Sequence, residues 1–153
     1  MTICTADFDG NRFTDLFLHD AATGRWFTVI TDGRGGFSLF SGGHFSPGMS
    51  VYIADFDGDG RSDIFAHNTT TGEWDECLSR GVGVSACQAG HWSPGWQVSV
   101  VDLNGDGRAD LLAYDPITGG WYQYLEATPG SSYSTTGFWE PGMTLIASPA
   151  NEP

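Results

Sequence analysis

The residues best suited to chemistry are aspartates spaced two apart in a short glycine-containing segment. Asp55, Asp57, Asp59 and Asp63 occupy positions 1, 3, 5 and 9 of such a segment. Glycine at position 6 permits a sharp bend, so these side chains and the carbonyl oxygen of position 7 can converge. Ca²⁺ prefers oxygen ligands of this kind, at roughly 2.3–2.6 Å. The segment therefore predicts a calcium-binding loop.

This loop occurs three times, at 7–15, 55–63 and 102–110. The first copy is the weakest, because Asn11 replaces an aspartate and Arg12 stands where glycine is expected. None of the copies is an EF-hand, because the glutamate needed at position 12 is absent. The alternative is a solvated aspartate–glycine turn without metal. The predicted ligands of structural Ca²⁺ are Asp7, Asp9, Asn11, Phe13, Asp15, Asp55, Asp57, Asp59, Arg61, Asp63, Asp102, Asn104, Asp106, Arg108 and Asp110, with Phe13, Arg61 and Arg108 acting through their carbonyls.

Two further motifs follow each loop in the same order. Thr-Gly-x-Trp and a glycine–aromatic–Pro-Gly segment return in every copy, beginning at Thr23, Thr71 and Thr118 and at Gly43, Gly90 and Gly137. Three anchors in one order indicate an internal repeat. The chain is therefore predicted to be a single repeat domain over 1–153, with repeats at about 2–50, 51–97 and 98–144. The segment 144–148 is predicted to form an extra strand, like the first strand of a further copy.

Each repeat is predicted to hold four short strands. In the second copy they are 51–54, 64–67, 73–78 and 84–88, separated by the acidic loop and by glycine turns. The chain is rich in residues that favour strands and tight turns, with 22 Gly, 10 Phe, 6 Trp and 5 Tyr. Turn signals every 8–12 residues between such strands are typical of an all-β sandwich, barrel or propeller. The fold class is therefore predicted to be all-β.

The acidic loop followed by Ile-Phe-Ala or Leu-Leu-Ala, and then by Thr-Gly-x-Trp, resembles the FG-GAP/VCBS repeat. That repeat builds calcium-bearing β-propellers in integrin α chains, in secreted bacterial proteins and in fungal lectins similar to the Psathyrella velutina lectin. The resemblance implies that each repeat is one propeller blade, with the acidic loop joining its first two strands. It also implies that sugar pockets lie between blades.

The number of repeats has a consequence for assembly. Propellers typically close with 4–8 blades, and open blade edges invite pairing with another chain. The simplest expectation is a homodimer that completes a six-bladed ring with two-fold symmetry. The alternatives are a β-trefoil, which also has three repeats, and a piece of a longer propeller.

The cysteines bear on the compartment. Cys77 and Cys87 fall on the third and fourth strands of the second repeat, where an antiparallel hairpin would place them opposite each other. They are predicted to form either a disulfide or two buried thiols. A disulfide would suit a secreted or extracellular protein, although no signal peptide is visible at Met1. Cys4 is left over.

The charge of the chain limits its partners. A formal charge of −13 disfavours nucleic acid and anionic membranes, and no stretch is apolar enough to be inserted into a bilayer. No nucleophile motif stands out, and the four histidines follow the repeat, whereas catalysis needs one asymmetric constellation. The chain is therefore predicted not to be an enzyme.

Binding is the favoured function. Aromatic rings stack on the apolar faces of sugars, and each repeat carries such residues before Pro-Gly. The resemblance to propeller lectins implies that the chain is a multivalent lectin, which would bind glycans through His44, Phe45, His91, Trp92, Phe138 and Trp139. These aromatics could instead be packing wedges between blades, which is the favoured role for Trp26, Trp74 and Trp121. The alternative function is a structural or adhesion propeller module that binds a protein partner.

Overall fold

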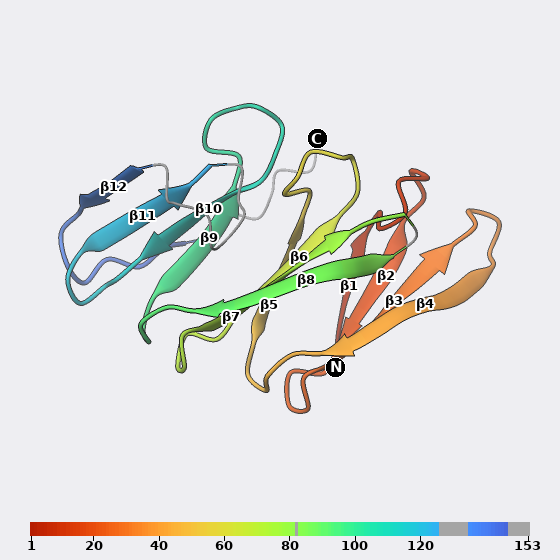
Figure 1. The fold of residues 1–153 in the computed structure, drawn as a ribbon, viewed down its shortest axis with the longest axis horizontal. Helices are drawn as coiled ribbons and strands as arrows, with labels where there is room; N and C mark the ends of the chain where they lie inside the picture. Colours follow the sequence, from red (N-terminus) through yellow and green to blue (C-terminus); the bar gives the residue numbers. More distant parts are fainter. Residues whose placement is uncertain (82, 126–134, 147–153) are drawn as a thin grey trace.

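The computed structural model describes residues 1–81, 83–125 and 135–146. These residues form three separate four-stranded antiparallel sheets and no helix (Figure 1). Each sheet is a simple meander in chain order, which is the topology of a propeller blade and not of a β-trefoil. The strands are β1 (Thr2–Ala6), β2 (Asp15–His19), β3 (Arg25–Thr31) and β4 (Phe37–His44) in blade 1; β5 (Ser50–Ala54), β6 (Asp63–His67), β7 (Glu73–Ser79) and β8 (Val84–His91) in blade 2; and β9 (Gln97–Val101), β10 (Asp110–Tyr114), β11 (Gly120–Tyr124) and β12 (Thr135–Phe138) in blade 3.

The blades lie side by side in chain order, with blade 2 in the middle (Figure 1). The predicted all-β fold and propeller blades are thus confirmed, and the β-trefoil alternative is wrong. The predicted extra strand at 144–148 is not formed by 144–146, and residues 147–148 lie outside the described residues. Instead of pairing with a strand, the Leu145 N–H donates to Gln97 Oε1 at 2.8 Å. No helix in the described part of the chain is long and apolar enough to cross a membrane.

The two repeated motifs are held together in space. The Trp92 N–H, in the segment between blades 2 and 3, donates to the carbonyl oxygen of Gly72 in the Thr-Gly turn at 2.8 Å. Gly72 has φ +84°, and a Cβ there would lie 2.0 Å from the carbonyl oxygen of Trp92. The same bond joins Phe45 to Gly24. Only glycine fits this close approach, which explains why both motifs return together.

Two apolar cores lie at the seams between adjacent blades. The first joins blades 1 and 2 and contains Phe8, Phe17, Trp26, Ile30, Phe45, Met49, Ile64, Ala66, Cys77 and Val84. The second joins blades 2 and 3 and contains Phe56, Phe65, Trp74, Val98, Leu111, Ala113 and Tyr124. A blade therefore buries its apolar surface mainly against its neighbours, as expected for a repeat architecture.

One cross-strand pair in blade 2 is covalent. Cys77 on β7 lies opposite Cys87 on β8, and the two form a disulfide with a Cα–Cα distance of 4.0 Å. Cys4 is a free, half-buried thiol. The disulfide joins the third and fourth strands of the middle blade, at the seam with blade 1.

Candidate functional site

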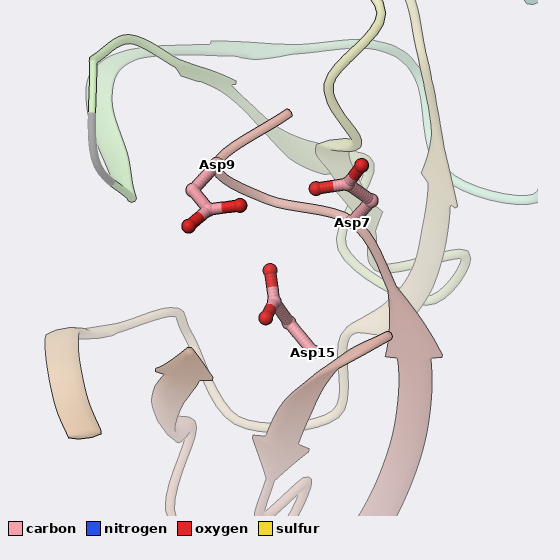
Figure 2. Close-up of side chains that lie close together, drawn as sticks. All are labelled: Asp7, Asp9 and Asp15. Carbon is pink, nitrogen blue, oxygen red and sulfur yellow. The ribbon is translucent and has the colours of Figure 1, made fainter. Parts of the chain in front are cut away.

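The first acidic loop brings three carboxylates together (Figure 2). Asp7 and Asp9 lie on the loop after β1, and Asp15 is the first residue of β2. One carboxylate oxygen from each lies within 4.8 Å of the others. Asp15 is fully buried and accepts hydrogen bonds from the Phe8 and Thr31 N–H groups, both at 2.8 Å. Burial and the charges of Asp15 and Asp7 raise the pKa of Asp9, as expected where carboxylates converge without a cation.

The second loop repeats this arrangement with Asp55, Asp57 and Asp63. Asp63 is fully buried at the start of β6 and accepts hydrogen bonds from the Phe56 N–H at 2.9 Å and the Ser79 N–H at 2.7 Å. Burial raises the pKa of Asp63 to about 6, and the nearby charges of Asp57 and Asp55 add to the rise. A bound cation would relieve this cost.

The side chains at position 5 do not join these clusters. Asp59 turns to Arg61, with Oδ2 2.9 Å from the guanidinium Nη1. Asp106 turns to Arg108 in the same way, and Asn11 donates through Nδ2 to Asp9 Oδ2 at 2.9 Å. Metal ligation by position 5 therefore requires these side chains to rotate.

The third loop differs from the other two. Among the described residues, Asp102, Asp106 and Asp110 do not form a comparable group of three acidic oxygens. Asn104 stands at position 3, and its amide Nδ2 donates to Asp106 Oδ2 at 3.0 Å. The third loop thus has one carboxylate fewer than the first two at positions 1, 3 and 9, because an amide stands at position 3. The predicted order of calcium affinity among the loops stays a prediction.

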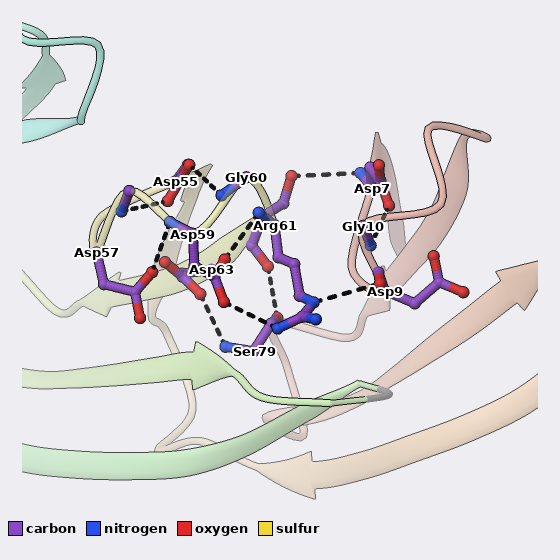
Figure 3. A network of polar contacts seen from close by, with 12 residues as sticks. Asp7, Asp9, Gly10, Asp55, Asp57, Asp59, Gly60, Arg61, Asp63 and Ser79 are labelled. Carbon is purple, nitrogen blue, oxygen red and sulfur yellow. Dashed lines mark hydrogen bonds and ion pairs between the residues drawn. The ribbon is translucent and has the colours of Figure 1, made fainter.

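The loops are also linked across the seams, which the sequence analysis missed. Arg61 reaches from the second loop to the first, where its Nε donates to the carbonyl oxygen of Asp9 at 3.2 Å (Figure 3). The Ser62 N–H donates to the carbonyl oxygen of Asp7 at 2.6 Å, and the Ala109 N–H does the same to Asp55 at 2.9 Å. The second and third loops therefore each hold the backbone of a candidate ligand in the preceding blade. The recurring arginine at position 7 was the available signal.

The donor set of the first two loops fits Ca²⁺. It consists of carboxylate oxygens on a tight turn, without the sulfur or imidazole ligands that softer metals prefer. Positive φ angles at Gly58 and Gly60, of +78° and +83°, produce the turn. Arg12 occupies the Gly60 position of the first loop with φ +68°, the only non-glycine residue with positive φ in the described chain. The first loop thus keeps its shape at a cost of order 1 kcal/mol.

An aromatic pocket opens at the seam between blades 2 and 3. It has a volume of about 290 Å³ and is lined by Trp92, Ser93, Trp96, Ala113, Tyr122 and Tyr124. The rings of Trp92 and Tyr124 are stacked with centroids 5.8 Å apart, and those of Trp96 and Tyr122 are 5.2 Å apart. Aromatic rings from the segment between the blades thus pack in pairs with rings from β11 along the lining of a cavity near the lower end of the size range of small-ligand sites.

The seam between blades 1 and 2 holds the equivalent pocket, with a different lining. Its volume is about 300 Å³, and it is lined by Trp26, Gly42, Gly43, His44, Phe45, Asp75, Cys77, Val84 and Cys87. The Trp26 Nε1–H is buried and has no hydrogen-bond partner among the described residues. Burial, with a contribution from Glu73, raises the pKa of Asp75. This pocket offers one aromatic wall and a second wall that contains a carboxyl group and the disulfide.

A third hollow lies on blade 3, on the side away from blade 2. It is lined by Trp139, Glu140, Met143, Thr144 and Leu145 and has a volume of about 480 Å³. Trp139 packs against Trp121 with tilted rings whose centroids are 5.4 Å apart, and it is 42% exposed. Among the described residues, those that line the hollow all lie in the segment that follows β12 of blade 3.

The predicted sugar-binding residues are distributed unevenly over these pockets. His44 and Phe45 line the pocket between blades 1 and 2. Trp92 lines the aromatic pocket between blades 2 and 3, and Trp139 lines the hollow on blade 3. Phe45 is only 3% exposed and packs on Trp26, so it serves mainly as the packing wedge considered above. His91 and Phe138 are exposed and line none of these three pockets.

The sequence analysis missed the opposite wall of each pocket. Tyr122 and Tyr124 on β11 come from the following blade, as do Asp75 and Cys77 on β7. Their alternation along the strand was visible in the sequence. Trp96, just after the second Pro-Gly, was visible as an unused aromatic in the linker between blades.

Comparisons with known proteins support the repeat assignment. An FG-GAP-like repeat model matches residues 7–66 and an FG-GAP repeat model matches residues 94–116, which together make up more than half of the chain. No match was found among curated proteins.

A solved structure of a lectin from Agrocybe aegerita is similar in fold. Its structure is described as the basis of specific recognition of non-reducing terminal N-acetylglucosamine. The match has a TM-score of 0.61 and 20% sequence identity, and it covers 88% of this chain and 37% of the lectin chain. This chain thus spans well under half of that lectin, and the likeness supports the fold alone. The repeat matches and the acidic loops show that the chain belongs to the FG-GAP repeat family, and the three sheets and this likeness show that it is built from the blades of a β-propeller.

Proposed function

We propose that this protein is a non-catalytic, extracellular carbohydrate-binding protein, in which sugars bind at the seams between blades and calcium stabilises the loops. The observation that carries the proposal is the pocket between blades 2 and 3. There, Trp92 and Trp96 from one blade face Tyr122 and Tyr124 from the next.

The chemistry of this pocket suits a sugar ring. Aromatic rings contact the apolar C–H faces of a pyranose, and the Ser93 and tyrosine hydroxyls lie at the same cavity to exchange hydrogen bonds with its hydroxyl groups. A site of this size binds a single sugar weakly, with Kd of order 1 mM. Repetition of the site compensates, since several weak sites on one particle raise the avidity by about 10²–10⁴.

N-acetylglucosamine is the first sugar to test. The lectin of similar fold recognises its non-reducing terminal form. Its acetamido methyl group is an additional apolar contact for an aromatic wall. The pocket between blades 1 and 2 has a carboxyl group at Asp75 in place of a tyrosine, so it is expected to prefer a different pattern of sugar hydroxyls.

Calcium is assigned a structural role. Asp7, Asp9 and Asp15 would hold one ion and Asp55, Asp57 and Asp63 another, with carbonyl oxygens completing each shell. The cation would remove the repulsion among these carboxylates and fix the loops that link the blades. Chelation is expected to lower the Tm, since a site filled at 100 times its Kd contributes about 2.7 kcal/mol. A Tm that is the same in chelator and in excess Ca²⁺ would contradict this role.

A glycan array with the calcium-loaded protein tests the proposal. We expect binding to glycans that end in N-acetylglucosamine or a related sugar with an apolar face. An array with no bound glycan would overturn the lectin proposal. It would favour the alternative of a structural or adhesion module, which is supported by apolar side chains exposed away from the pockets, such as Ile117 at 79% exposure.

A further inference from the structure

Each blade presents a different face to each of its neighbours. At the seam between blades 1 and 2, blade 1 contributes aromatic rings such as Phe17 and Trp26, whereas blade 2 contributes aliphatic side chains such as Ile64. The seam between blades 2 and 3 repeats this division at the second strand, with Phe65 on one side and Leu111 on the other, while the third strand of blade 3 adds Tyr122 and Tyr124 to the Leu111 side. We call the first the aromatic face, which contacts the following blade, and the second the aliphatic face, which contacts the preceding one.

The aromatic face of blade 3 is open in this chain. Leu103 is 40% exposed, whereas Phe8 and Phe56 at the same repeat position are 0% and 1% exposed. Met143 is 54% exposed, compared with 4% for Met49 at its position in the first repeat. Side chains that a following blade covers elsewhere thus lie at the surface of blade 3.

The aliphatic face of blade 1 is open in the same way. Leu16 is half-buried, whereas Ile64 at the same place in the strand register is fully buried. Phe37, which pairs with Thr31, is 66% exposed, whereas Val84 at the equivalent position of blade 2 is 7% exposed. The two open faces are thus of the two kinds that pack together at both seams inside the chain.

The hollow on blade 3 is half of a seam pocket. Trp139, Glu140 and Met143 stand at the repeat positions that Trp92, Ser93 and Trp96 hold in the aromatic pocket. In that pocket the opposite wall comes from the following blade, through side chains on its third strand. The strand pairing identifies their counterparts in blade 1: Phe27 pairs with Leu18 as Tyr122 pairs with Ala113, and Val29 pairs with Leu16 as Tyr124 pairs with Leu111.

We propose that the aromatic face of blade 3 packs on the aliphatic face of blade 1 in a second copy of this chain. The new seam completes a third sugar pocket, with Trp139 and Met143 from one chain and Phe27 and Val29 from the other. Two such seams, related by a two-fold axis, close a ring of six blades. The assignment of a sugar to this pocket rests on the proposed carbohydrate-binding function, whereas the packing of the two chains at the new seam does not.

The edges of the two faces also match. At both internal seams, the N–H of loop position 8 donates to the carbonyl of position 1 in the preceding loop. Thr14 and Asp102 are the corresponding donor and acceptor between two copies. Phe13, 49% exposed, stands at the sequence position of the bridging arginine. Arg61 and Arg108 lie beside Gly10 and Gly58 of the preceding loops, whereas Gly105 has open space beside it.

Opposite charges add to this match. Arg25 lies over the Phe27 ring, with its guanidinium carbon 5.4 Å from the centroid, and so belongs to the blade 1 wall. Glu140 belongs to the blade 3 wall. In a chain with a formal charge of −13, a pairing of cation and carboxylate at the contact favours this orientation over others.

The mass in solution and the number of sugar sites test the inference together. We expect the wild-type chain to have twice its 16.4 kDa mass by light scattering. Met143→Glu, at an exposed position where folding is not at risk, and Phe27→Glu on the opposite face should each give the single-chain mass. Thr70→Glu, on an exposed turn of blade 2, introduces the same charge away from the seam and should leave the mass doubled. By calorimetry with N-acetylglucosamine or the best glycan of the array, Met143→Glu should lose one site per chain and keep the aromatic pocket.

The outcomes separate this inference from the proposed function. A single-chain mass for the wild type, or a doubled mass for both face variants, overturns the second-copy seam, even if sugar still binds in the aromatic pocket. A doubled mass with an unchanged number of sites in Met143→Glu overturns the third pocket. Absence of sugar binding in a doubled wild type overturns the proposed function and the pocket's ligand, and leaves the seam established.

Discussion

The two seams inside the chain have the same architecture and different chemistry. Both pack an aromatic face on an aliphatic face, and both place a pocket next to the Pro-Gly segment. The wall supplied by the following blade differs, since Asp75 and the Cys77–Cys87 disulfide stand where Tyr122 and Tyr124 stand in the next repeat. The repeat thus fixes where the pockets lie, and under the proposed function two positions on the third strand would decide which ligand each pocket binds.

The largest effect is expected from the disulfide at the first seam. Replacing Cys77 and Cys87 together by alanine should lower the free energy of unfolding by about 2–4 kcal/mol, because a short loop is no longer closed in the unfolded chain and a buried contact is lost. Urea unfolding monitored by tryptophan fluorescence measures the change.

Cys4→Ser is the matched control, since Cys4 is a free thiol. Its unfolding midpoint should stay near that of the wild type. An equal loss in both variants would show that the disulfide does not stabilise this seam.

The next largest effect is expected on glycan affinity, when a residue in the wall of the pocket between blades 2 and 3 is replaced by its counterpart in the other pocket. Tyr122→Asp gives the aromatic pocket the residue that the first pocket has at this position. We expect affinity for the best glycan to fall tenfold or more, because the ring that faces Trp96 is removed. Calorimetry measures it.

His91→Ala is the control for that exchange, because His91 lies outside the pocket although the sequence suggested it as a ligand residue. Affinity should be unchanged. If His91→Ala lost glycan affinity and Tyr122→Asp did not, the sugar would have to bind outside the aromatic pocket.

The blade between the two seams should respond to pH through Glu76. Burial raises the pKa of Glu76 to about 7, whereas an unfolded glutamate titrates near 4.5. The folded state therefore keeps a proton that the unfolded state releases, and the free energy of unfolding should fall as pH rises from about 4.5 to 7, by up to about 1.4 kcal/mol per pH unit. Glu76→Gln, measured at saturating Ca²⁺, should remove this contribution.

At the same position, blade 1 has Thr28 and blade 3 has Gln123. Because neither side chain is ionisable, this pH response is expected of blade 2. His67 acts in the opposite direction, since burial lowers its pKa to about 4 and stability falls as pH falls below 6.5. The difference between wild type and Glu76→Gln isolates Glu76, and a difference that does not vary with pH would refute this assignment.

The smallest effect is expected at the link between the loops. Arg61→Ala removes the bond to the Asp9 carbonyl and should cost about 1 kcal/mol, since the side chain is partly exposed. Urea unfolding again measures it. Arg34→Ala, on an exposed turn, should lower the free energy of unfolding by less. Equal losses in the two variants would mean that the bond from Arg61 to the Asp9 carbonyl does not contribute to stability.

The sequence predicted the features that follow the repeat. The loops, the glycine turns and the strands recur with a nearly constant spacing, and alternating β-formers have few ways to pack. The opposed positions of Cys77 and Cys87 followed from hairpin geometry in the same way.

The features that depend on neighbouring blades were harder to predict. Asp59 pairs with Arg61, a contact that was not predicted, because the arginine bridging to the preceding loop lies within reach. Ligation of a metal by Asp59 stays a prediction. Tyr122 was missed because its role depends on which blade it faces. The strand expected at 144–148 is not formed by 144–146, since a strand needs a partner edge.

The account depends most directly on sugar binding in the aromatic pocket. Wild type and Trp96→Ala should be compared on one glycan array at saturating Ca²⁺, with circular dichroism to establish that both are folded. The account predicts that the wild type binds glycans with terminal N-acetylglucosamine or a related sugar and that Trp96→Ala loses most of this signal. No binding by the wild type, or equal binding by the folded variant, would contradict it.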